Sequence, residues 1–235
     1  MTKNEIKYLK KLNLKKYRYE ENKFIIEGID AINEAKSQNI KLKIYSSNPQ
    51  NKPDVLITNE EINQILNSKT PQDIFALCEM LKPKEISGLT IVLDNIQDPG
   101  NLGTIIRNCV AFGVTNIIIN GVDLYNDKTL RASKGSIFKI NITQTKDLES
   151  FLLKLKRTHK IVGTLLDKSA KDIKELKNEN YCIVFGNEAN GISPSIIKLL
   201  DEKYYIPIKF ESLNVAIANA IVLYELKRGK DAKKV

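Results

Sequence analysis

Apolar residues in the larger part of the chain occur in short β-prone runs that alternate with segments of helical spacing. Strands are expected near residues 89–94, 116–120, 137–141, 160–165, 181–185 and 204–207. Helices are expected near residues 101–112, 128–134, 147–157, 194–200 and 213–228. Such alternation is typical of α/β proteins, so the pattern predicts a mostly parallel sheet with helices on both faces.

The amino-terminal part has its own pattern, which predicts a smaller α/β module. Short strands are expected near residues 24–26, 42–45, 55–58 and 74–78, and helices over 4–18, over 29–37 and from residue 59. Residues 81–88 contain Pro83, Gly88 and several charged side chains, which is typical of a linker. We therefore expect one domain over residues 1–82, a linker over 83–88 and a second domain over 89–235.

One strand–loop–helix segment carries the most informative chemistry. Residues 93–108 read LDNIQDPGNLGTIIRN, an apolar strand followed by dense turn residues and a helix. A loop at the carboxyl end of a strand in an α/β sheet is where ligands bind. Arg107 shares a helix face with Gly103 and Thr104, so it is expected to point back towards this loop. Its position alone leaves both a structural ion pair and a functional role open.

Two further segments have the same strand–loop–helix pattern. They are residues 183–193, IVFGNEANGIS, and residues 206–216, IPIKFESLNVA. Together with residues 93–108 and with residues 123–136, DLYNDKTLRASKGS, they resemble the SpoU (TrmH-like) family of RNA ribose 2′-O-methyltransferases. The resemblance covers roughly residues 89–229, with the motifs in the family's order.

The resemblance implies S-adenosylmethionine-dependent 2′-O-methylation of a ribose in RNA, with ribosomal RNA of the 23S type favoured over transfer RNA. It also implies a dimer with the active site at the interface, and a deep trefoil knot at the carboxyl-terminal end of the catalytic domain. Residues 24–28, FIIEG, are similar to the start of the ribosomal-protein-like, RNA substrate-binding domain that precedes the catalytic domain in many of these enzymes.

Other functions stay open beside this one. One is a transfer-RNA 2′-O-methyltransferase, and another is a non-catalytic RNA-binding or ribosome assembly factor on the same fold. A nicotinamide-dependent enzyme is disfavoured, because no G-x-G-x-x-G follows a strand.

The family's functional residues map onto the motifs of this chain. By resemblance, the catalytic residues are Arg107, Asn101, Glu188, Ser212 and Asn214. Cofactor contacts in the family come largely from backbone atoms of the knotted loops. These contacts map to Thr164, Gly186, Ile206 and Leu213.

Residue chemistry limits these roles. In the family, the arginine that maps to Arg107 contacts the RNA phosphate and helps to deprotonate the 2′-hydroxyl. A guanidinium fork suits phosphate, but the pKa of free arginine, about 12.5–13.8, makes a general-base role harder, so the substrate phosphate is a candidate proton acceptor. The lone histidine, His159, lies outside every motif and is interpreted as a surface or junction residue, so the base is not an imidazole. Asn101 either caps its helix or holds the loop and Arg107. Glu188 is either a plain loop acid or a carboxylate that orients that arginine or a loop amide. Ser212 is a natural cap of the last helix.

Two departures from the family pattern lie in the cofactor loops. Only Lys209 and Phe210 stand between Ile208 and Glu211, where relatives usually have a slightly longer loop that contains glycine. Residues 188–191, EANG, replace a glutamate followed by two glycines. Both changes affect the shape of the expected cofactor pocket.

Charge is concentrated at the start of the chain. The formal net charge is +9, and residues 1–19 carry seven basic side chains against one acid, Glu5. Such a segment predicts a surface for an anionic partner such as RNA, and a solvated lysine face is the alternative. The residues expected to bind RNA are Lys10, Lys11, Lys15, Lys16, Arg18 and Arg131.

The expected final helix is apolar on nearly all sides. From Leu213 to Leu226 the only strongly polar residues are Asn214, Asn219 and Glu225. A helix of this kind needs burial on several sides, so a homodimer is expected.

The three cysteines lie far apart, and no apolar run approaches the roughly 18 residues of a membrane span. We expect a cytoplasmic protein with no membrane span and no bound metal.

Overall fold

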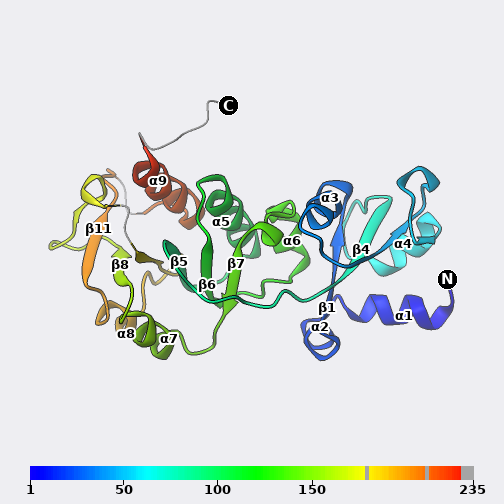
Figure 1. Ribbon diagram of the computed structural model, residues 1–235, viewed down its shortest axis with the longest axis horizontal. Helices are drawn as coiled ribbons and strands as arrows, with labels where there is room; N and C mark the ends of the chain where they lie inside the picture. Colours follow the sequence, from blue (N-terminus) through cyan, green and yellow to red (C-terminus); the bar gives the residue numbers. More distant parts are fainter. Residues whose placement is uncertain (178–179, 210–211, 229–235) are drawn as a thin grey trace. The chain divides into compact units, whose positions relative to one another are not determined.

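The computed structural model describes residues 1–177, 180–209 and 212–228, and the chain separates into two compact units (Figure 1). The first unit contains residues 1–82 together with 123–139, and the second contains 83–122 and the residues from 140 onward. The expected domain limits place residues 123–139 in the second domain, whereas their packing groups them with the first unit. Phe210 and Glu211 of the shortened loop, and residues 229–235 of the expected second domain, lie outside the described residues.

The second unit is built on a seven-stranded sheet in which every pair of neighbouring strands is parallel. Its strand order is β7-β6-β5-β10-β8-β11-β9. The strands are β5 (Thr90–Ile96), β6 (Asn116–Gly121), β7 (Asn141–Gln144), β8 (Lys160–Thr164), β9 (Lys171–Asp172), β10 (Tyr181–Phe185) and β11 (Glu202–Tyr205). This parallel sheet confirms the predicted α/β class, and the buried central strands β5 and β10 place their carboxyl ends side by side.

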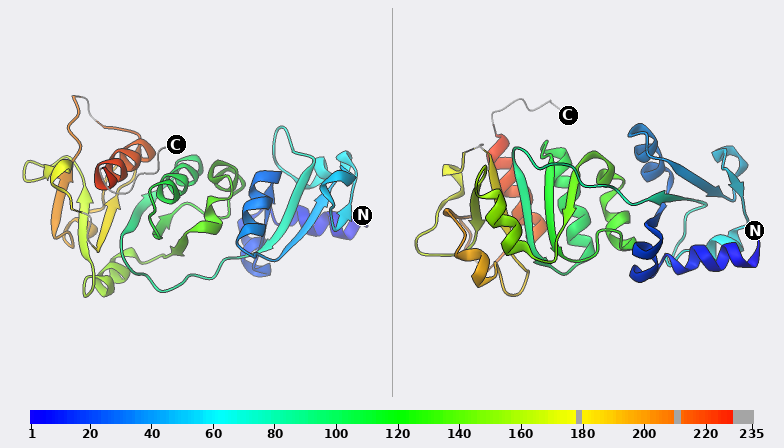
Figure 2. Two further views of the ribbon diagram at one scale, coloured as in Figure 1. Left: turned by 45° about the horizontal axis from the view of Figure 1, so that its top comes forward. Right: turned by 60° about the horizontal axis from the view of Figure 1, so that its bottom comes forward.

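Helices cover both faces of this sheet, as predicted (Figures 1 and 2). One face carries α5 (Pro99–Ala111) and α9 (Val215–Lys227), which pack against each other. The other face carries α7 (Leu148–Leu155) and α8 (Pro194–Ile197), whose apolar side chains join Val92, Ile118 and Val184 in one core cluster. The two layers hold the strand ends, and the loops that follow them, in fixed positions.

Several expected elements of the second half are shifted or shortened. The strand expected at 137–141 is a 3-10 turn over Ser136–Lys139, and β7 begins only at Asn141. Gly135 has a φ of +81° before this turn, and the Phe138 N–H bonds to the Gly135 carbonyl, so the backbone turns there. The strand expected at 204–207 is β11 and ends at Tyr205, shortly before Pro207, which has no N–H for a ladder. The helix expected at 194–200 is shorter and covers only Pro194–Ile197 (α8).

The first unit contains a four-stranded mixed sheet in the order β1-β4-β2-β3. Its strands are β1 (Lys23–Glu27), β2 (Leu42–Ser46), β3 (Val55–Leu56) and β4 (Ile74–Glu79). Its helices are α1 (Lys3–Lys11), α2 (Lys15–Glu21), α3 (Ile29–Ser37), α4 (Asn59–Ile65) and α6 (Asp127–Ser133), with a short 3-10 turn over Pro49–Asn51. Residues 123–139 belong to this unit because the ring of Phe24 in β1 lies 4.5 Å from that of Tyr125 and 6.4 Å from that of Phe138, between centroids.

The prediction of a single basic helix over residues 4–18 is wrong, because the chain forms two helices there, α1 and α2. Leu14 has an extended backbone between α1 and α2. The Arg18 guanidinium donates from Nη1 to the carbonyl oxygens of Leu12 (2.9 Å) and Asn13 (2.7 Å), which the end of α1 leaves free. Leu12, which follows α1, is anchored in the first unit's core. The chain changes direction there before α2 begins. No helix within the described residues is both long enough and apolar enough to span a bilayer.

Candidate active site

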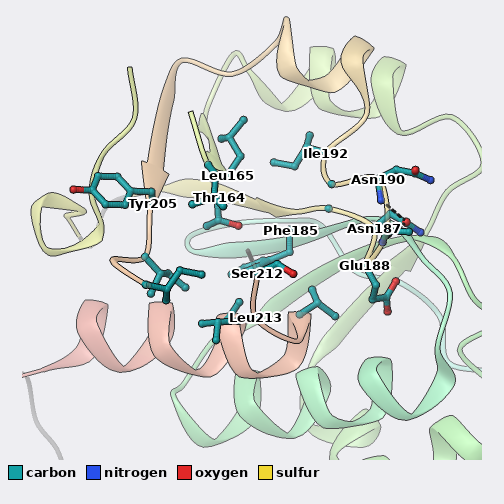
Figure 3. A pocket seen from close by; sticks show the side chains of 18 of the residues that line it. Thr164, Leu165, Phe185, Asn187, Glu188, Asn190, Ile192, Tyr205, Ser212 and Leu213 are labelled. Carbon is teal, nitrogen blue, oxygen red and sulfur yellow. Dashed lines mark hydrogen bonds between the residues drawn. The ribbon is translucent and has the colours of Figure 1, made fainter. Parts of the chain in front are cut away.

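A pocket of about 410 Å³ lies beside the carboxyl ends of β8, β10 and β11 (Figure 3). Its lining comes from the loop after β10, from the chain after β8, from residues 205–208 and from the start of α9. All four residues expected to contact the cofactor line it: Thr164, Gly186, Ile206 and Leu213. Figure 3 shows Tyr205 at one end of this pocket and Asn187 and Glu188 at the other.

The loop after β10 folds tightly enough to form one wall of the pocket. Asn187 and Gly191 exchange two backbone hydrogen bonds of 2.9 Å, and Gly191 has a φ of +68°. A Cβ atom on Gly186 would lie 2.1 Å from the carbonyl carbon of Gly191, so any side chain at position 186 would displace this loop. Neither Ala189 nor Asn190 has a positive φ, and the N–H groups of both donate to Asn187 Oδ1. The EANG departure therefore closes the loop without strain at the non-glycine positions.

Three predicted catalytic residues from three different motifs form one hydrogen-bonded chain. Asn101 Nδ2 donates to Glu188 Oε1 at 2.9 Å, and Asn214 Nδ2 donates to Asn101 Oδ1 at 3.0 Å. Glu188 Oε2 also accepts from the backbone N–H of Gln97 at 3.4 Å. Asn101 thus links the loops after β10 and before α9, and Glu188 holds a loop amide, not the arginine.

The helix caps differ from two of the sequence-based interpretations. Asp98 caps α5, accepting from the Asn101 N–H at 2.8 Å, so Asn101 is not the cap. Asn214 caps α9, since its Oδ1 accepts from the N–H groups of Ala216 (2.9 Å) and Ile217 (3.3 Å). The prediction that Ser212 caps this helix is wrong, because the first helical turn begins later, at Val215. Ser212 is exposed and lines the pocket instead.

Arg107 is exposed on α5, in the half of the helix that follows the Asn101 turn. Within the described residues it makes no hydrogen bond and no ion pair, so a structural ion pair does not account for it there. The five N–H donors of its planar guanidinium are therefore available for an anion such as phosphate.

Asp94 is a site residue that the sequence analysis missed. It is buried at the end of β5, where its Oδ2 accepts from the Ser193 N–H at 2.7 Å and from the Ser193 hydroxyl. Asn187 Nδ2 adds a bond of 2.8 Å to the carbonyl of Asn95. These contacts tie the loop after β10 to β5. An acid at the end of an apolar strand was the only available signal for Asp94.

The other reactive side chains of the chain lie outside the pocket. His159 is buried, not at the surface, at the junction of α7 and β8, and its Nδ1 lies 2.8 Å from the Thr158 hydroxyl. Burial raises the pKa of the Cys182 thiol to about 12 and that of Cys109 further, so neither supplies a thiolate. No group of three His, Cys, Asp or Glu side chains suited to a metal occurs within the described residues.

The residues predicted to bind RNA lie in the first unit, and they differ in exposure and in their ion-pair partners. The four predicted lysines lie in α1 and α2 and are exposed: Lys10, Lys11, Lys15 and Lys16. The Lys11 and Lys16 ammonium groups lie 5.2 and 5.8 Å from the centre of the Tyr17 ring. Arg131 faces the carboxylates of Asp127 (2.9 Å) and Glu27 (3.7 Å).

Arg18 does not belong to that surface, and its predicted role in RNA binding is wrong. It is only 4% exposed, and its Nη2 forms an ion pair with the buried carboxylate of Asp123. Tyr19 donates from its hydroxyl to the same carboxylate at 2.8 Å. Arg18 therefore holds the fold of the first unit together and has no group to offer to a ligand.

Comparisons with known proteins agree with this arrangement. The model of the SpoU rRNA Methylase family matches residues 88–224, and that of the MRM3-like substrate binding domain matches residues 3–76. The Bacillus subtilis 23S rRNA (guanosine(2553)-2′-O)-methyltransferase RlmP is 34% identical over 238 residues, covering 95% of this chain and 96% of its own.

Solved structures show the same fold over nearly the whole chain. An RNA methyltransferase of the TrmH family from Porphyromonas gingivalis is 29% identical, with a TM-score of 0.88 over 97% of this chain and 99% of its own. The AdoMet-bound rRNA methyltransferase from Sinorhizobium meliloti is 26% identical, with a TM-score of 0.83 over 99% of this chain and 97% of its own.

Proposed function

The chain belongs to the SpoU rRNA methylase family, and from that premise we propose that it methylates a ribose 2′-hydroxyl of 23S-type ribosomal RNA. S-Adenosylmethionine is its cofactor. The observation that carries the proposal is the chain Asn214–Asn101–Glu188, because it joins three separate motifs at the edge of the pocket. A protein that had kept only the fold would have no need for this polar connection between exposed loops.

The pocket suits S-adenosylmethionine. Phe185, Leu165 and Ile192 provide apolar walls for a flat base, and the tight loop after Gly186 presents backbone groups and leaves no room for a side chain there. The four family-derived contact residues converge on this one pocket, which supports their assignment. When bound, the cofactor supplies an electrophilic methyl group.

We assign Arg107 to the RNA phosphate next to the reacting ribose. Its guanidinium binds two phosphate oxygens and places the 2′-hydroxyl near the pocket. The positive charge would favour loss of the hydroxyl proton to a phosphate oxygen. The 2′-oxygen would bond to the methyl carbon as the bond between that carbon and the cofactor sulfur breaks, which leaves S-adenosylhomocysteine. Asn101 and Glu188 keep the loops in place around this geometry, while Asn214 caps α9 and Ser212 lines the pocket.

The first unit is proposed to bind RNA through the exposed lysines of α1 and α2. No acidic side chain within the described residues forms an ion pair with Lys10, Lys11 or Lys15, so their charge is available to phosphates. Lys16 makes only a long, exposed contact of 3.8 Å to Glu20. Exposed pairs of this kind contribute little, so Lys16 also remains available.

We also propose that the carboxyl-terminal segment of the chain forms a trefoil knot, as in the family.

We further propose a homodimer that forms through α9. Ile217 and Tyr224 are 53% and 55% exposed, and half-buried Ile221 lies between them on the same helix face. A second copy would cover this apolar stripe. Sedimentation at twice the mass of one chain supports the dimer, and a monomer that methylates RNA at the wild-type rate contradicts it.

The function is tested by methyl transfer from labelled S-adenosylmethionine to protein-free 23S rRNA, to 16S rRNA and to transfer RNA. Label on 23S rRNA, mapped to a ribose 2′-oxygen, is the expected result. A guanosine is the first position to examine, because guanosine is the target named for the Bacillus subtilis relative. Label on transfer RNA alone would favour that substrate, and tight RNA binding without methyl transfer would favour an assembly factor.

A further inference from the structure

The position of the Arg107 side chain is set by the helix α5 that carries it. Its side chain has no hydrogen-bond or ion-pair partner among the described residues, so its position depends on where α5 lies against α9. These two helices carry residues of the first and third motifs, and each of them contributes a side chain to the contact between the motifs. The relative register of α5 and α9 therefore decides where the guanidinium meets the pocket.

Two asparagine contacts fix that register. The first is the bond between Asn101 and Asn214 at the amino ends of both helices. The second is made by Asn108, the residue after Arg107, whose Nδ2 donates to the Ala216 carbonyl at 3.0 Å and to Asn219 Oδ1 at 3.3 Å. Asn101 and Asn108 are seven residues apart, so they share a face of α5 two turns apart. Arg107 lies between the two contacts along the helix.

Asn219 is an unusual residue for its place. It is fully buried, at 0% exposure, in a helix that is otherwise largely apolar. Its Nδ2 makes no hydrogen bond of good geometry within the described chain, and its polar neighbour there is the buried thiol of Cys109, a weak acceptor. A buried amide that is only half satisfied lowers stability compared with leucine. In other proteins, buried polar groups of this kind specify one register at the expense of stability.

We propose that half-buried Asn108 and fully buried Asn219 form an amide lock that positions Arg107 for methyl transfer, an inference that rests on the proposed function. Sliding α9 by one turn against α5 would separate Asn108 from Asn219 and leave the Asn219 side-chain carbonyl without its partner in an apolar contact. The lock thus excludes registers that the surrounding apolar side chains would accept. Asn108 and Asn219 are positioning residues, since they touch neither the pocket nor the expected RNA.

The test compares two buried asparagines with the same substitution. Asn219→Leu removes the acceptor of the lock while keeping the number and branching of the side-chain heavy atoms. Asn116→Leu is the matched control, because Asn116 is also buried and its Oδ1 accepts a hydrogen bond of 2.9 Å from Asn141 Nδ2, but it lies at the amino end of β6. Parallel strands place that end opposite the pocket. Asn108→Asp, which keeps the size but removes the donor, tests the other half of the lock.

Both lock variants are expected to lower kcat by about tenfold or more, since small displacements of a catalytic group can cost up to ~10²-fold. The KM for S-adenosylmethionine is expected to stay within about twofold, because the pocket walls are unchanged. Asn219→Leu should melt at or above the wild-type temperature, whereas Asn116→Leu should melt lower and keep its kcat at a temperature where it is fully folded.

A double-mutant cycle shows whether the lock acts through Arg107. In an Arg107→Lys background, Asn108→Asp is expected to cost much less than it does alone, because the fork that it positions has gone. Full additivity, or wild-type kcat in both lock variants, would overturn the proposal. An inactive wild type would instead contradict the proposed function, so the two failures are distinguishable.

Discussion

Arg18 and Arg107 are both arginines that the sequence marks out, and the fold uses them in opposite ways. Arg18 lies in α2 of the first unit, is 4% exposed and gives its donors to two carbonyls and the Asp123 carboxylate. Arg107 lies exposed on α5 of the second unit and gives its donors to no described residue. A motif identified Arg107, whereas only local charge density identified Arg18. The difference shows that local charge density does not distinguish an arginine that is free to bind a ligand from one whose donors are used in intramolecular contacts.

Breaking the buried pair is expected to have the largest effect. Arg18→Ala leaves the Asp123 carboxylate buried without its partner, which typically costs about 3–5 kcal/mol. Urea unfolding of the full chain measures this loss. The paired variant Arg18→Met with Asp123→Asn is the control and should recover much of the stability, because it removes both charges. A free energy of unfolding within about 1 kcal/mol of wild type for Arg18→Ala would contradict the structural role.

Removing the exposed arginine is expected to change the reaction and leave the fold intact. Arg107→Ala should lower kcat for methyl transfer by about 10²-fold or more, the usual effect of losing one electrostatic donor in the transition state. Its melting temperature and its affinity for S-adenosylmethionine, measured by calorimetry, should stay at wild-type values. Arg107→Lys should restore little, since a point charge lacks the fork that binds two phosphate oxygens. Wild-type turnover by Arg107→Ala would remove this residue from the mechanism.

The smallest expected effect concerns the lysines that share the amino-terminal segment with Arg18. Replacing Lys11 and Lys16 by alanine should weaken RNA binding. The slope of log K against log salt should fall by about 0.7 to 0.9 for each phosphate that the variant no longer neutralises. The pair Lys52→Ala with Lys69→Ala removes the same charge from exposed positions elsewhere in the first unit and serves as the control. Equal slopes for the two double variants would mean that α1 and α2 are only a solvated surface.

Local patterns in the sequence predicted the strand–loop–helix units well, because each motif contains its own strand, turn and helix start. The same reasoning could not decide what Asn101 does. Asparagine is a good cap, but Asp98 stands three residues earlier and takes that role, which leaves the Asn101 amide for Glu188 and Asn214. Those partners are 87 and 113 residues away, beyond the reach of any local pattern.

The same limit explains the errors in the first unit. Arg18 is buried because Asp123, 105 residues away, packs against it. Ile6, Leu9 and Leu12 have the spacing of one helix face, and Leu9 and Leu12 are buried. This spacing could not show that the helix ends at Lys11, since that end is stabilised by a guanidinium from the following helix. Tertiary partners, not propensity, decided these positions.

Residues 123–139 have a consequence for how this protein could be taken apart. The chain leaves the first unit after residue 82, returns to it at 123 and leaves it again after 139, so the units are joined by three covalent connections and not by one. A cut at the linker would strip the cover from Tyr125 and Phe138, whose rings pack on Phe24. Recombination at a single point therefore cannot exchange the first unit for another. A viable chimera has to transfer both segments together, which ties the inheritance of the first unit to that of the second.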